Sequence, residues 1–343
     1  MKHFQLIKAR TLDEARAAAT ATVPEVTMDA APPGAVLKAG GVDLLDLMKE
    51  GVCEPAGVVS LKRLGGDAQL RGITPTATGG LRIGALTTLT DIEHHGGIAR
   101  DYTALHEATK HAATPQVRNM ATLGGNLAQR PRCWYFRSAE HDDCLKRGGG
   151  TCYALTGQNE IHAIFGNRTC AMVPATSLAT ALMALGASVE LMGGSSSGSA
   201  ATRQVPLERF FVTPEQDVSR ETVLRAGEVI TAVVLPVLPK GARSYYIKQA
   251  AKESYDWALA DVAVVAEVRG GKVVDARVVA GAVAPVPMRS ESAERALVGK
   301  AITSASAKTA GEAIVEGATP LAHNGFKVPM LSAITKDCVQ KLA

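Results

Sequence analysis

The sequence is poor in aromatic residues, which make up 4% of its 343 residues and include only two tryptophans. Proteins that bind single-stranded nucleic acid stack the bases on aromatic side chains, so this composition argues against such a partner. The formal net charge is only +4, with 37 basic and 33 acidic residues, which is too small for a DNA-binding surface. We therefore expect no nucleic-acid partner.

Long apolar runs are also absent. A membrane-spanning helix needs about 20 apolar residues and a secretion signal needs about 7–15. The sequence begins MKHFQLIKARTLDEARAAATA, in which an isolated FQLI precedes an alanine-rich helical pattern. We expect neither a membrane span nor a secretion signal of its own.

Six cysteines are too few for a disulfide scaffold in a chain of this length. Four of them fall within 38 residues, with the spacing C-x10-C-x7-C-x17-C: Cys133, Cys144, Cys152 and Cys170. This segment lacks the CxxC pairs that zinc ribbons and fingers nearly always contain. Iron–sulfur clusters need four converging thiolates and tolerate irregular spacing. The spacing therefore favours a cluster, with structural zinc as the open alternative, and Cys53 and Cys338 are expected to be unrelated.

Two glycine pairs indicate places where a ligand approaches the backbone. Gly40 and Gly41 lie between a predicted strand at 36–37 and a predicted helix over 44–48. Backbone N–H groups and a helix dipole at such a turn bind anions, although a tight turn without ligand is the alternative. Gly124 and Gly125 follow Thr122 in TLGGN, where a Cβ would occupy the place of a flat or phosphorylated ligand. Neither pair has the GxGxxG spacing of a dinucleotide-binding Rossmann turn.

The pattern of elements predicts an α+β protein of two or three domains. Short strands are expected at 4–9, 58–64 and 81–89, helices from Thr11 and over 101–113, and a helix followed by a strand over 177–191. The stretch 193–204 is predicted to be a flexible Gly/Ser-rich turn. Two β-branched strands around Gly270 and Gly271 predict a hairpin, followed by helices near 291–299, 303–317 and 329–342. The isolated histidines at 94, 95, 106 and 111 are expected at the surface or at helix caps.

Motifs along nearly the whole chain resemble the flavoprotein subunit of the molybdenum hydroxylases, the xanthine dehydrogenase and aldehyde oxidase family. They are, in order, AGGVDLLDLMK, LRIGALTTL, RNMATLGGNLAQRPR, YYIKQAAKESYDWALADVAV and GAVAPVPMR. The cysteine segment is similar to that of the medium subunit of bacterial three-subunit aldehyde oxidoreductases, where it holds a [4Fe-4S] cluster; most other flavin subunits of the family lack it. The implied fold is an FAD-binding domain of the vanillyl-alcohol-oxidase (PCMH) type followed by a CO-dehydrogenase-flavoprotein-like C-terminal α+β domain. The implied bounds are 1–238, with subdomains of about 1–60 and 61–238 and a cluster loop at 130–171, and then 239–343.

The resemblance also implies binding residues and assigns no catalytic acid or base to this chain. The first glycine pair is expected to hold the FAD pyrophosphate, the second to lie beside the diphosphate and isoalloxazine, and a C-terminal lysine to contact the flavin. Many relatives continue GGN with a downstream aspartate, and here Gln129 or Arg130 is expected to replace its contact. The implied FAD contacts are Leu37, Lys38, Ala39, Gly40, Gly41, Val42, Asp43, Leu44, Thr122, Gly124, Gly125, Asn126, Gln129, Arg130 and Lys248. The implied [4Fe-4S] ligands are Cys133, Cys144, Cys152 and Cys170.

The function implied by the resemblance is electron relay. A large partner subunit with a molybdenum cofactor would oxidise an aldehyde, and a small partner subunit with [2Fe-2S] clusters would pass the electrons to FAD here and then to an acceptor. The alternatives are a related hydroxylase acting on an N-heterocycle or purine, a self-contained flavin oxidoreductase, and a zinc-containing scaffold without enzyme activity. The chain is expected in the periplasm if a signal-bearing partner exports it, and otherwise in the cytoplasm.

Overall fold

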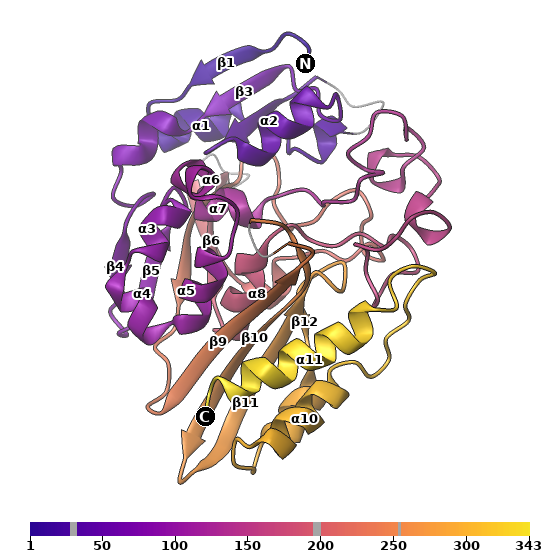
Figure 1. Cartoon of the computed structure of the whole chain (residues 1–343). Helices are drawn as coiled ribbons and strands as arrows, with labels where there is room; N and C mark the ends of the chain where they lie inside the picture. Colours follow the sequence, from indigo (N-terminus) through magenta and orange to yellow (C-terminus); the bar gives the residue numbers. More distant parts are fainter. Residues whose placement is uncertain (28–32, 195–199, 253–254) are drawn as a thin grey trace.

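The computed structural model describes residues 1–27, 33–194, 200–252 and 255–343, and this part of the chain forms three β-sheets with helices packed on them (Figure 1). The N-terminal sheet is parallel, in the order β1-β3-β2: β1 (Gln5–Lys8), β2 (Ala35–Lys38) and β3 (Gly57–Ser60). Two helices connect its strands: α1 (Leu12–Ala18) and α2 (Val42–Lys49). The side chain of Thr11 accepts a hydrogen bond from the backbone of Glu14, so the predicted cap of α1 is confirmed.

The middle sheet is antiparallel, in the order β4-β5-β8-β6-β7. Its strands are β4 (Ile73–Pro75), β5 (Leu81–Gly84), β6 (Ser188–Gly194), β7 (Ala200–Pro206) and β8 (Val229–Leu235). The main hydrophobic core lies between this sheet and several short helices: α3 (Leu89–Glu93), α4 (Gly96–Asp101), α5 (Thr103–Lys110), α7 (Leu123–Leu127) and α8 (Ser177–Ala184). Helix α6 (Pro115–Met120) precedes α7.

Three expectations for the N-terminal and middle sheets need correction. The strand expected over 81–89 ends at Gly84, because Thr88 and Asp91 form a capping box that begins α3. The strand expected over 58–64 ends at Ser60 and is followed by a 3₁₀ turn, Lys62–Gly66. Residues 200–204 of the expected flexible turn belong to β7, where they pair with β6, and 195–199 lie outside the described residues. His95 caps α4, as expected for an isolated histidine.

The cysteine segment runs from the end of α7 to the start of α8 with only two short 3₁₀ turns, Leu145–Arg147 and Tyr153–Leu155. Figure 1 shows it at the right, between the N-terminal sheet and the loops that precede α11. Cys133, Phe136 and Cys144 pack into the core of the N-terminal sheet, whereas Ile164 and Phe165 pack into the C-terminal core. The segment therefore joins the two ends of the molecule.

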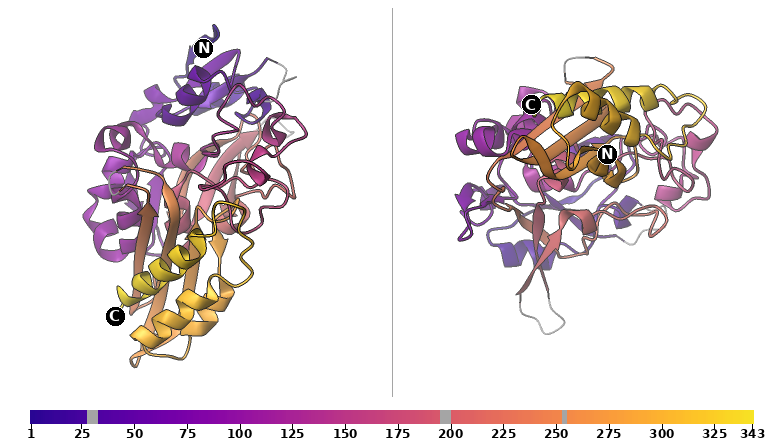
Figure 2. Two further views of the ribbon diagram at one scale, coloured as in Figure 1. Left: turned by 45° about the vertical axis from the view of Figure 1, so that its right-hand side comes forward. Right: turned by 90° about the horizontal axis from the view of Figure 1, so that it is seen from below.

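The C-terminal sheet is antiparallel, in the order β12-β11-β10-β9: β9 (Ala242–Ala250), β10 (Ala258–Arg269), β11 (Lys272–Gly281) and β12 (Met288–Arg289). The predicted hairpin is confirmed, since Gly270 and Gly271 adopt φ of 57° and 76° between β10 and β11. Helices α9 (Glu291–Leu297), α10 (Ser304–Ala313) and α11 (Lys327–Gln340) pack on this sheet, as Figure 2 shows, and α5 and α8 also contact it. The α+β class and the three C-terminal helices are thus confirmed.

A buried carboxyl group lies where α8 meets this sheet. Asp261 of β10 is 2% exposed, and its carboxyl lies so near Thr180 of α8 that a Cβ at Gly281 of β11 would collide with both side chains. Burial raises the pKa of Asp261 from 3.8 to about 7, opposed by the hydrogen bond of Thr180 and the charges of Lys248 and Lys327. A glycine at 281 is therefore required by packing.

The raised pKa of Asp261 predicts a pH dependence of stability. Between pH 4 and 7 the folded chain holds a proton that the unfolded chain has lost, so stability falls as the pH rises through this window. Asp261→Asn should remove this dependence, with a difference of about 3 kcal/mol between pH 5 and pH 8 in the free energy of unfolding. Urea unfolding of both proteins at the two pH values measures it. An equal slope in both proteins would contradict the assignment.

Candidate functional site

A cavity of about 320 Å³ lies where β2, the start of α2, the α6–α7 region and the β9–β10 connection meet. Both glycine motifs reach it, although about 80 residues separate them in the sequence. The residues expected to contact FAD that line it are Leu37, Ala39, Gly40, Gly41, Val42, Asp43, Leu44, Thr122, Gly125, Asn126, Gln129 and Lys248. The structure thus brings most of the expected binding residues together.

The two glycines of the first pair have different physical roles. Gly41 caps the N-terminus of α2 with φ of 83°, a backbone conformation that other residues rarely adopt. At Gly40 a Cβ would collide with the backbone carbonyl of Met120, so packing against the end of α6 also requires a glycine there. Substitution at either position would therefore strain the fold, not only obstruct a ligand.

The two glycines of the second pair also differ: Gly124 is required by packing, whereas Gly125 borders open space. A Cβ at Gly124 would lie 2.9 Å from the Cβ of Ala85, so this glycine packs against the middle sheet. At Gly125 a Cβ would meet only the Thr122 hydroxyl, at 3.0 Å, and the Cβ of Ala39 at 4.0 Å. Gly125 lines the first cavity and a second one of about 150 Å³. A side chain at 125 would consequently enter the space where the two cavities adjoin.

The second cavity lies between α1, β3 and the segment that leads into β8. It shares Val23, Leu37, Ala39, Gly125 and Ala128 with the first cavity. Its other lining is mainly apolar, with Leu61, Leu86 and Ile230, together with the polar side chains of Glu221 and Arg225. The two cavities therefore form an elongated site that suits a long ligand with one flat apolar end.

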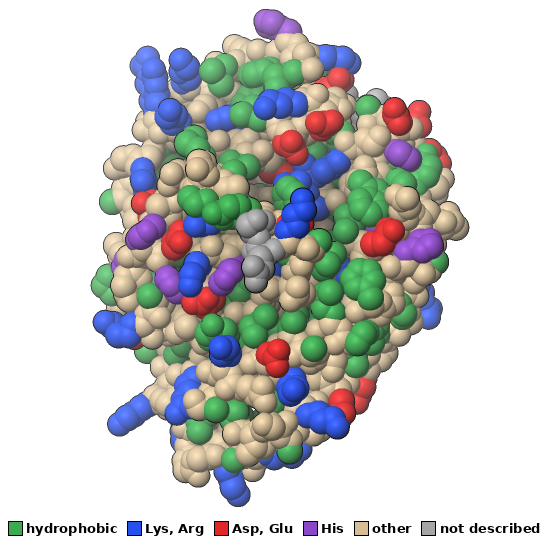
Figure 3. Space-filling view, viewed as in Figure 1, with side chains coloured by type: hydrophobic (Ala, Val, Ile, Leu, Met, Phe, Trp, Pro, Cys, Tyr) green, Lys and Arg blue, Asp and Glu red, His purple; other side chains and the backbone are tan. Residues whose placement is uncertain are grey.

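The far end of the first cavity is bounded by the C-terminal domain. Lys248 of β9 donates hydrogen bonds from Nζ to the carbonyl oxygens of His111 (2.6 Å) and Asp256 (2.7 Å). Burial lowers the pKa of Lys248, opposed by the charges of Asp261 and Asp256. The guanidinium of Arg132 lies over the ring of Trp257, 2.9 Å from its centroid. On the face shown in Figure 3, Lys and Arg side chains and hydrophobic side chains meet in the middle of the molecule.

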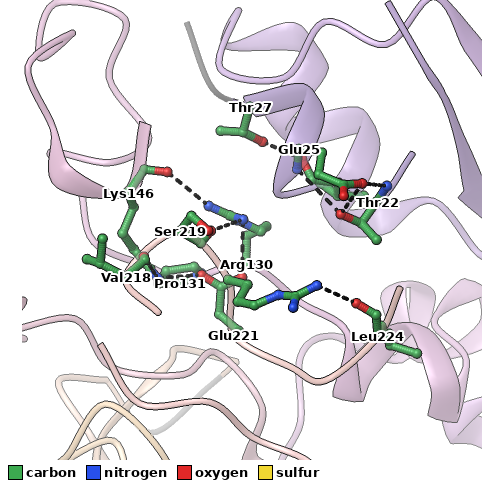
Figure 4. Close-up of polar contacts among 12 residues, drawn as sticks. Thr22, Glu25, Thr27, Arg130, Pro131, Lys146, Val218, Ser219, Glu221 and Leu224 are labelled. Atoms are coloured by element: carbon green, nitrogen blue, oxygen red, sulfur yellow. Dashed lines mark hydrogen bonds and ion pairs between the residues drawn. The ribbon is translucent and has the colours of Figure 1, made fainter. Parts of the chain in front are cut away.

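Three of the residues expected to contact FAD do not line the first cavity. Gly124 lines the second cavity, and Lys38 approaches the carbonyl oxygen of Ala39 with Nζ at 3.4 Å. Arg130 is 1% exposed and donates to the carbonyl oxygen of Ser219 at 3.0 Å (Figure 4). The expectation that Arg130 replaces a flavin contact is not supported by this placement, whereas Gln129 does line the cavity.

Arg130 and Lys146 of the cysteine segment form a buried charge cluster with Glu221. Its Nη1 lies 3.3 Å from Oε2 of Glu221, and Nζ of Lys146 lies 2.8 Å from Oε1 of the same carboxylate. Lys146 also donates to the carbonyl oxygen of Val218 at 2.7 Å. Two buried cations thus share one carboxylate, and a net positive charge lies beside the cysteines.

Glu221→Gln should destabilise the chain strongly, because it removes the carboxylate that both buried cations share. Breaking a buried ion pair on one side costs about 3–5 kcal/mol. The matched control is Glu291→Gln, since Glu291 pairs with Arg295 at 3.5 Å on the exposed face of α9 and its loss should cost below about 1 kcal/mol. Urea unfolding measures both. A loss as small for Glu221→Gln as for the control would contradict the prediction.

The four cysteines of the segment line one small cavity, together with apolar and aromatic side chains such as Phe136 and Tyr153. Backbone N–H groups near each sulfur lower the pKa of its thiol. They belong to Tyr135 and Phe136 for Cys133, Lys146 for Cys144, Ala154, Leu155 and Ala171 for Cys152, and Met172 for Cys170. N–H groups directed at sulfur favour the thiolate form. Cys53 and Cys338 do not line this cavity, and Cys338 instead approaches the carbonyl oxygen of Tyr245 at 3.4 Å.

The thiols differ in acidity. The hydrogen bond with Cys170 lowers the pKa of Cys152 to about 6, while burial raises the pKa of Cys133 to about 12. The charge of Lys146 favours the thiolates of Cys144 and Cys170. Among the described residues, no three His, Cys, Asp or Glu side chains are arranged to hold a single metal ion.

Sequence reasoning missed three features of the site. The second cavity is built from scattered apolar residues that carry no motif. Glu221 gave no signal because its partners are 75 and 91 residues away, at Lys146 and Arg130. His162 lies within the cysteine segment with Nε2 at 3.2 Å from Sγ of Cys133. The sequence did contain a signal for this contact, because His162 lies between Cys152 and Cys170 in the cysteine segment.

Asn126 closes the base of the cysteine segment. Its Oδ1 accepts a hydrogen bond from the hydroxyl of Thr176 at 2.5 Å, and its Nδ2 donates to Gln129 at 3.0 Å. Asp43 of α2 accepts from the backbone N–H of Arg130 at 2.9 Å and pairs with Arg137 at 2.6 Å. The start of the cysteine segment is therefore fixed directly to the first cavity.

Comparison with known proteins identifies matching families over both parts of the chain. Residues 2–238 match the family of the FAD binding domain in molybdopterin dehydrogenase, and residues 245–342 match the CO dehydrogenase flavoprotein C-terminal domain. The chain is 37% identical over 298 residues to the aldehyde oxidoreductase FAD-binding subunit PaoB of Escherichia coli (strain K12), covering 86% of this chain and 87% of the relative. It is 26% identical over 275 residues to the nicotine 6-hydroxylase medium subunit of Paenarthrobacter nicotinovorans, covering 80% and 76% of the two chains.

The fold has a counterpart among solved structures. A chain of the carbon monoxide dehydrogenase from Hydrogenophaga pseudoflava superposes with a TM-score of 0.69 at 26% identity, covering 99% of this chain and 96% of that one. In the parts of the chain that the structure describes, no helix combines the length and the apolar character needed to cross a membrane.

Proposed function

Because this chain belongs to the family of FAD-binding subunits of the molybdenum hydroxylases, we propose that it carries electrons out of an aldehyde-oxidising complex. The relative with 37% identity is an aldehyde oxidoreductase subunit, which favours an aldehyde as the substrate of the complex. A related hydroxylase that acts on an N-heterocycle is the second candidate, favoured by the nicotine 6-hydroxylase relative. Two domains, 1–238 and 239–343, are part of this proposal.

The observation that carries the proposal is the elongated pair of cavities that meet at Gly125. The apolar second cavity suits the adenosine end of FAD, and backbone N–H groups at the start of α2 suit its diphosphate. The isoalloxazine would lie toward Lys248 and Trp257, where the C-terminal domain bounds the first cavity. When bound, FAD supplies the redox chemistry, while this chain positions it and excludes water from its ring.

We also propose a [4Fe-4S] cluster held by Cys133, Cys144, Cys152 and Cys170. The fit rests on three observations: the four cysteines line one small cavity, backbone N–H groups near each sulfur lower the pKa of its thiol, and buried Lys146 brings positive charge beside them. A cluster bound by four thiolates has a net negative charge, so this environment favours its retention. Structural zinc is the alternative outcome of the metal analysis.

The proposed partners are a large subunit with the molybdenum cofactor and a small subunit with [2Fe-2S] clusters. This chain has no plant-ferredoxin C-x4-C-x2-C pattern that would hold such clusters itself. Electrons would therefore arrive from the small subunit and leave this chain for an acceptor. Access of the small subunit to the flavin requires that the two contact each other near the first cavity.

The test is anaerobic purification of this chain with and without its partners, followed by absorption spectroscopy and by FAD and metal analysis. We expect one FAD and about four irons bound by this chain, and bleaching of the flavin by an aldehyde only when the partners are present. Bleaching of the flavin in the isolated chain would instead support a self-contained flavin oxidoreductase. A colourless chain containing zinc would contradict both cofactor assignments.

A further inference from the structure

The imidazole of His162 is held against one of the four sulfurs. Its Nε2 lies 3.2 Å from Sγ of Cys133, and the two residues are only 1% and 9% exposed. The ring also packs against Trp134, with the centroids 5.4 Å apart, and against Tyr135 at 6.0 Å. This contact is therefore shielded from water, which would otherwise compete for the sulfur.

Two buried side chains of the C-terminal domain fix the backbone that carries this ring. Lys327 donates from Nζ to the carbonyl oxygens of His162 (2.8 Å) and Ala282 (2.6 Å). Asn324 donates from Nδ2 to the carbonyl oxygens of His162 and Ala163, each at 3.2 Å. Lys327 and Asn324 are both fully buried. These buried hydrogen bonds therefore fix the backbone at His162 and, with it, the position of the imidazole.

The chemistry of sulfur decides which way the hydrogen bond runs. An iron-bound thiolate carries no proton and can only accept, and a buried imidazole is favoured in its neutral form with a single N–H. Nδ1 of His162 makes no well-aligned hydrogen bond within the described residues, and the backbone of Asn159 lies close enough to the ring to raise its pKa. The direction therefore follows from the contact itself, because Nε2 is the nitrogen that faces Sγ and the thiolate can only accept. The N–H then lies on Nε2 and is directed at Cys133.

We propose that His162 sets the reduction potential of the [4Fe-4S] cluster by donating its Nε2–H to Sγ of Cys133. The inference rests on the cluster assigned above. The reduced cluster holds one more electron than the oxidised cluster, so its sulfurs are more negative and accept the hydrogen bond more strongly. The bond consequently favours reduction and raises the potential, and no proton moves with the electron.

His162→Phe tests this proposal, because it keeps a buried ring and removes the donor. The full chain in its complex is reduced stepwise while the electron paramagnetic resonance of the reduced [4Fe-4S] cluster is recorded. At a fixed potential near the midpoint we expect the ratio of reduced to oxidised cluster to fall about tenfold, equivalent to about 59 mV for one electron. His162→Gln, which restores an N–H donor, should recover part of this shift.

The matched control is His141→Phe. The His141 ring packs on Tyr135 and Tyr153 in the same segment, with centroids 5.0 and 4.8 Å apart, and should leave the potential unchanged. An unshifted potential in His162→Phe, or an equal shift in His141→Phe, would overturn the inference while leaving the cluster in place. Loss of the cluster from both His162 variants would show a purely structural role. Absence of iron from the wild-type chain would instead overturn the proposed function itself.

Discussion

Gly125→Val should yield a folded chain that has lost FAD. The valine side chain would enter the space in which the two cavities adjoin, which an elongated flavin nucleotide must cross. Neither the backbone nor the core opposes the substitution strongly, because the nearest atom to a Cβ at 125 is the Thr122 hydroxyl at 3.0 Å. We expect at least about a tenfold fall in retained FAD, corresponding to about 1.4 kcal/mol or more of binding free energy. Flavin released by denaturation and measured by fluorescence gives the content.

Gly96→Val is the matched control for this change. Gly96 is also within the first turn of a short helix, α4, and a Cβ there would have no atom within 4 Å. It should cost a similar amount of helix propensity and leave FAD content unchanged. FAD retained at the wild-type level in Gly125→Val would show that the ligand does not cross this point. Substitution of Gly41 would be less informative, because its φ of 83° makes any side chain strained.

Cys144→Ser should remove the iron from the chain. A cluster needs all four thiolates, and serine replaces one of them with a poorer ligand for iron. We expect the content to fall from about four irons to near none per chain. Cys53→Ala is the control, since Cys53 belongs to the same hydrophobic cluster as Cys133 and Cys144 but does not line the cavity of the four sulfurs. Iron and zinc analysis of the anaerobically purified proteins measures the result.

Loss of the cluster should also weaken FAD retention without abolishing it. Asp43 lines the first cavity and binds both Arg130 and Arg137 at the start of the cysteine segment, so disorder there would reach the start of α2. The side chains of the second cavity would be left in place. Iron retained in Cys144→Ser, or zinc in the wild-type chain, would defeat the cluster assignment.

The elements of this fold could be predicted where a local pattern determines them. Thr11 begins α1 and the pair Gly270 and Gly271 turns the hairpin, because capping and positive φ act over a few residues. The strand expected over 81–89 failed at Gly84 for the same reason, since the capping box of Thr88 acts more strongly than the β propensity of its neighbours. Glycine motifs located the first cavity because close backbone approach demands a specific residue.

The rest of the site depends on contacts between residues far apart in the sequence, which no local pattern predicts. Glu221 becomes the partner of Arg130 and Lys146 only when an irregular segment folds back against the core. The contact of His162 with Cys133 depends on Lys327 and Asn324, more than 160 residues further along the chain. Because the cysteine segment has little regular structure, the direction of its side chains cannot be predicted from the sequence, and these contacts become visible only in the three-dimensional structure.

The hydrogen bond between Thr176 and Asn126 holds the two ends of the cysteine segment together. Helices α7 and α8 contact each other directly, so the two ends of the segment meet at one point of the core. The entropy cost of a loop grows slowly, by about 0.6 kcal/mol for each doubling of its length. A flavin domain of this topology can therefore carry a long insertion or a short connection between the same two helices without rearranging its sheet. The junction between α7 and α8 is therefore the place where the length of this connection can change with the least effect on the middle sheet.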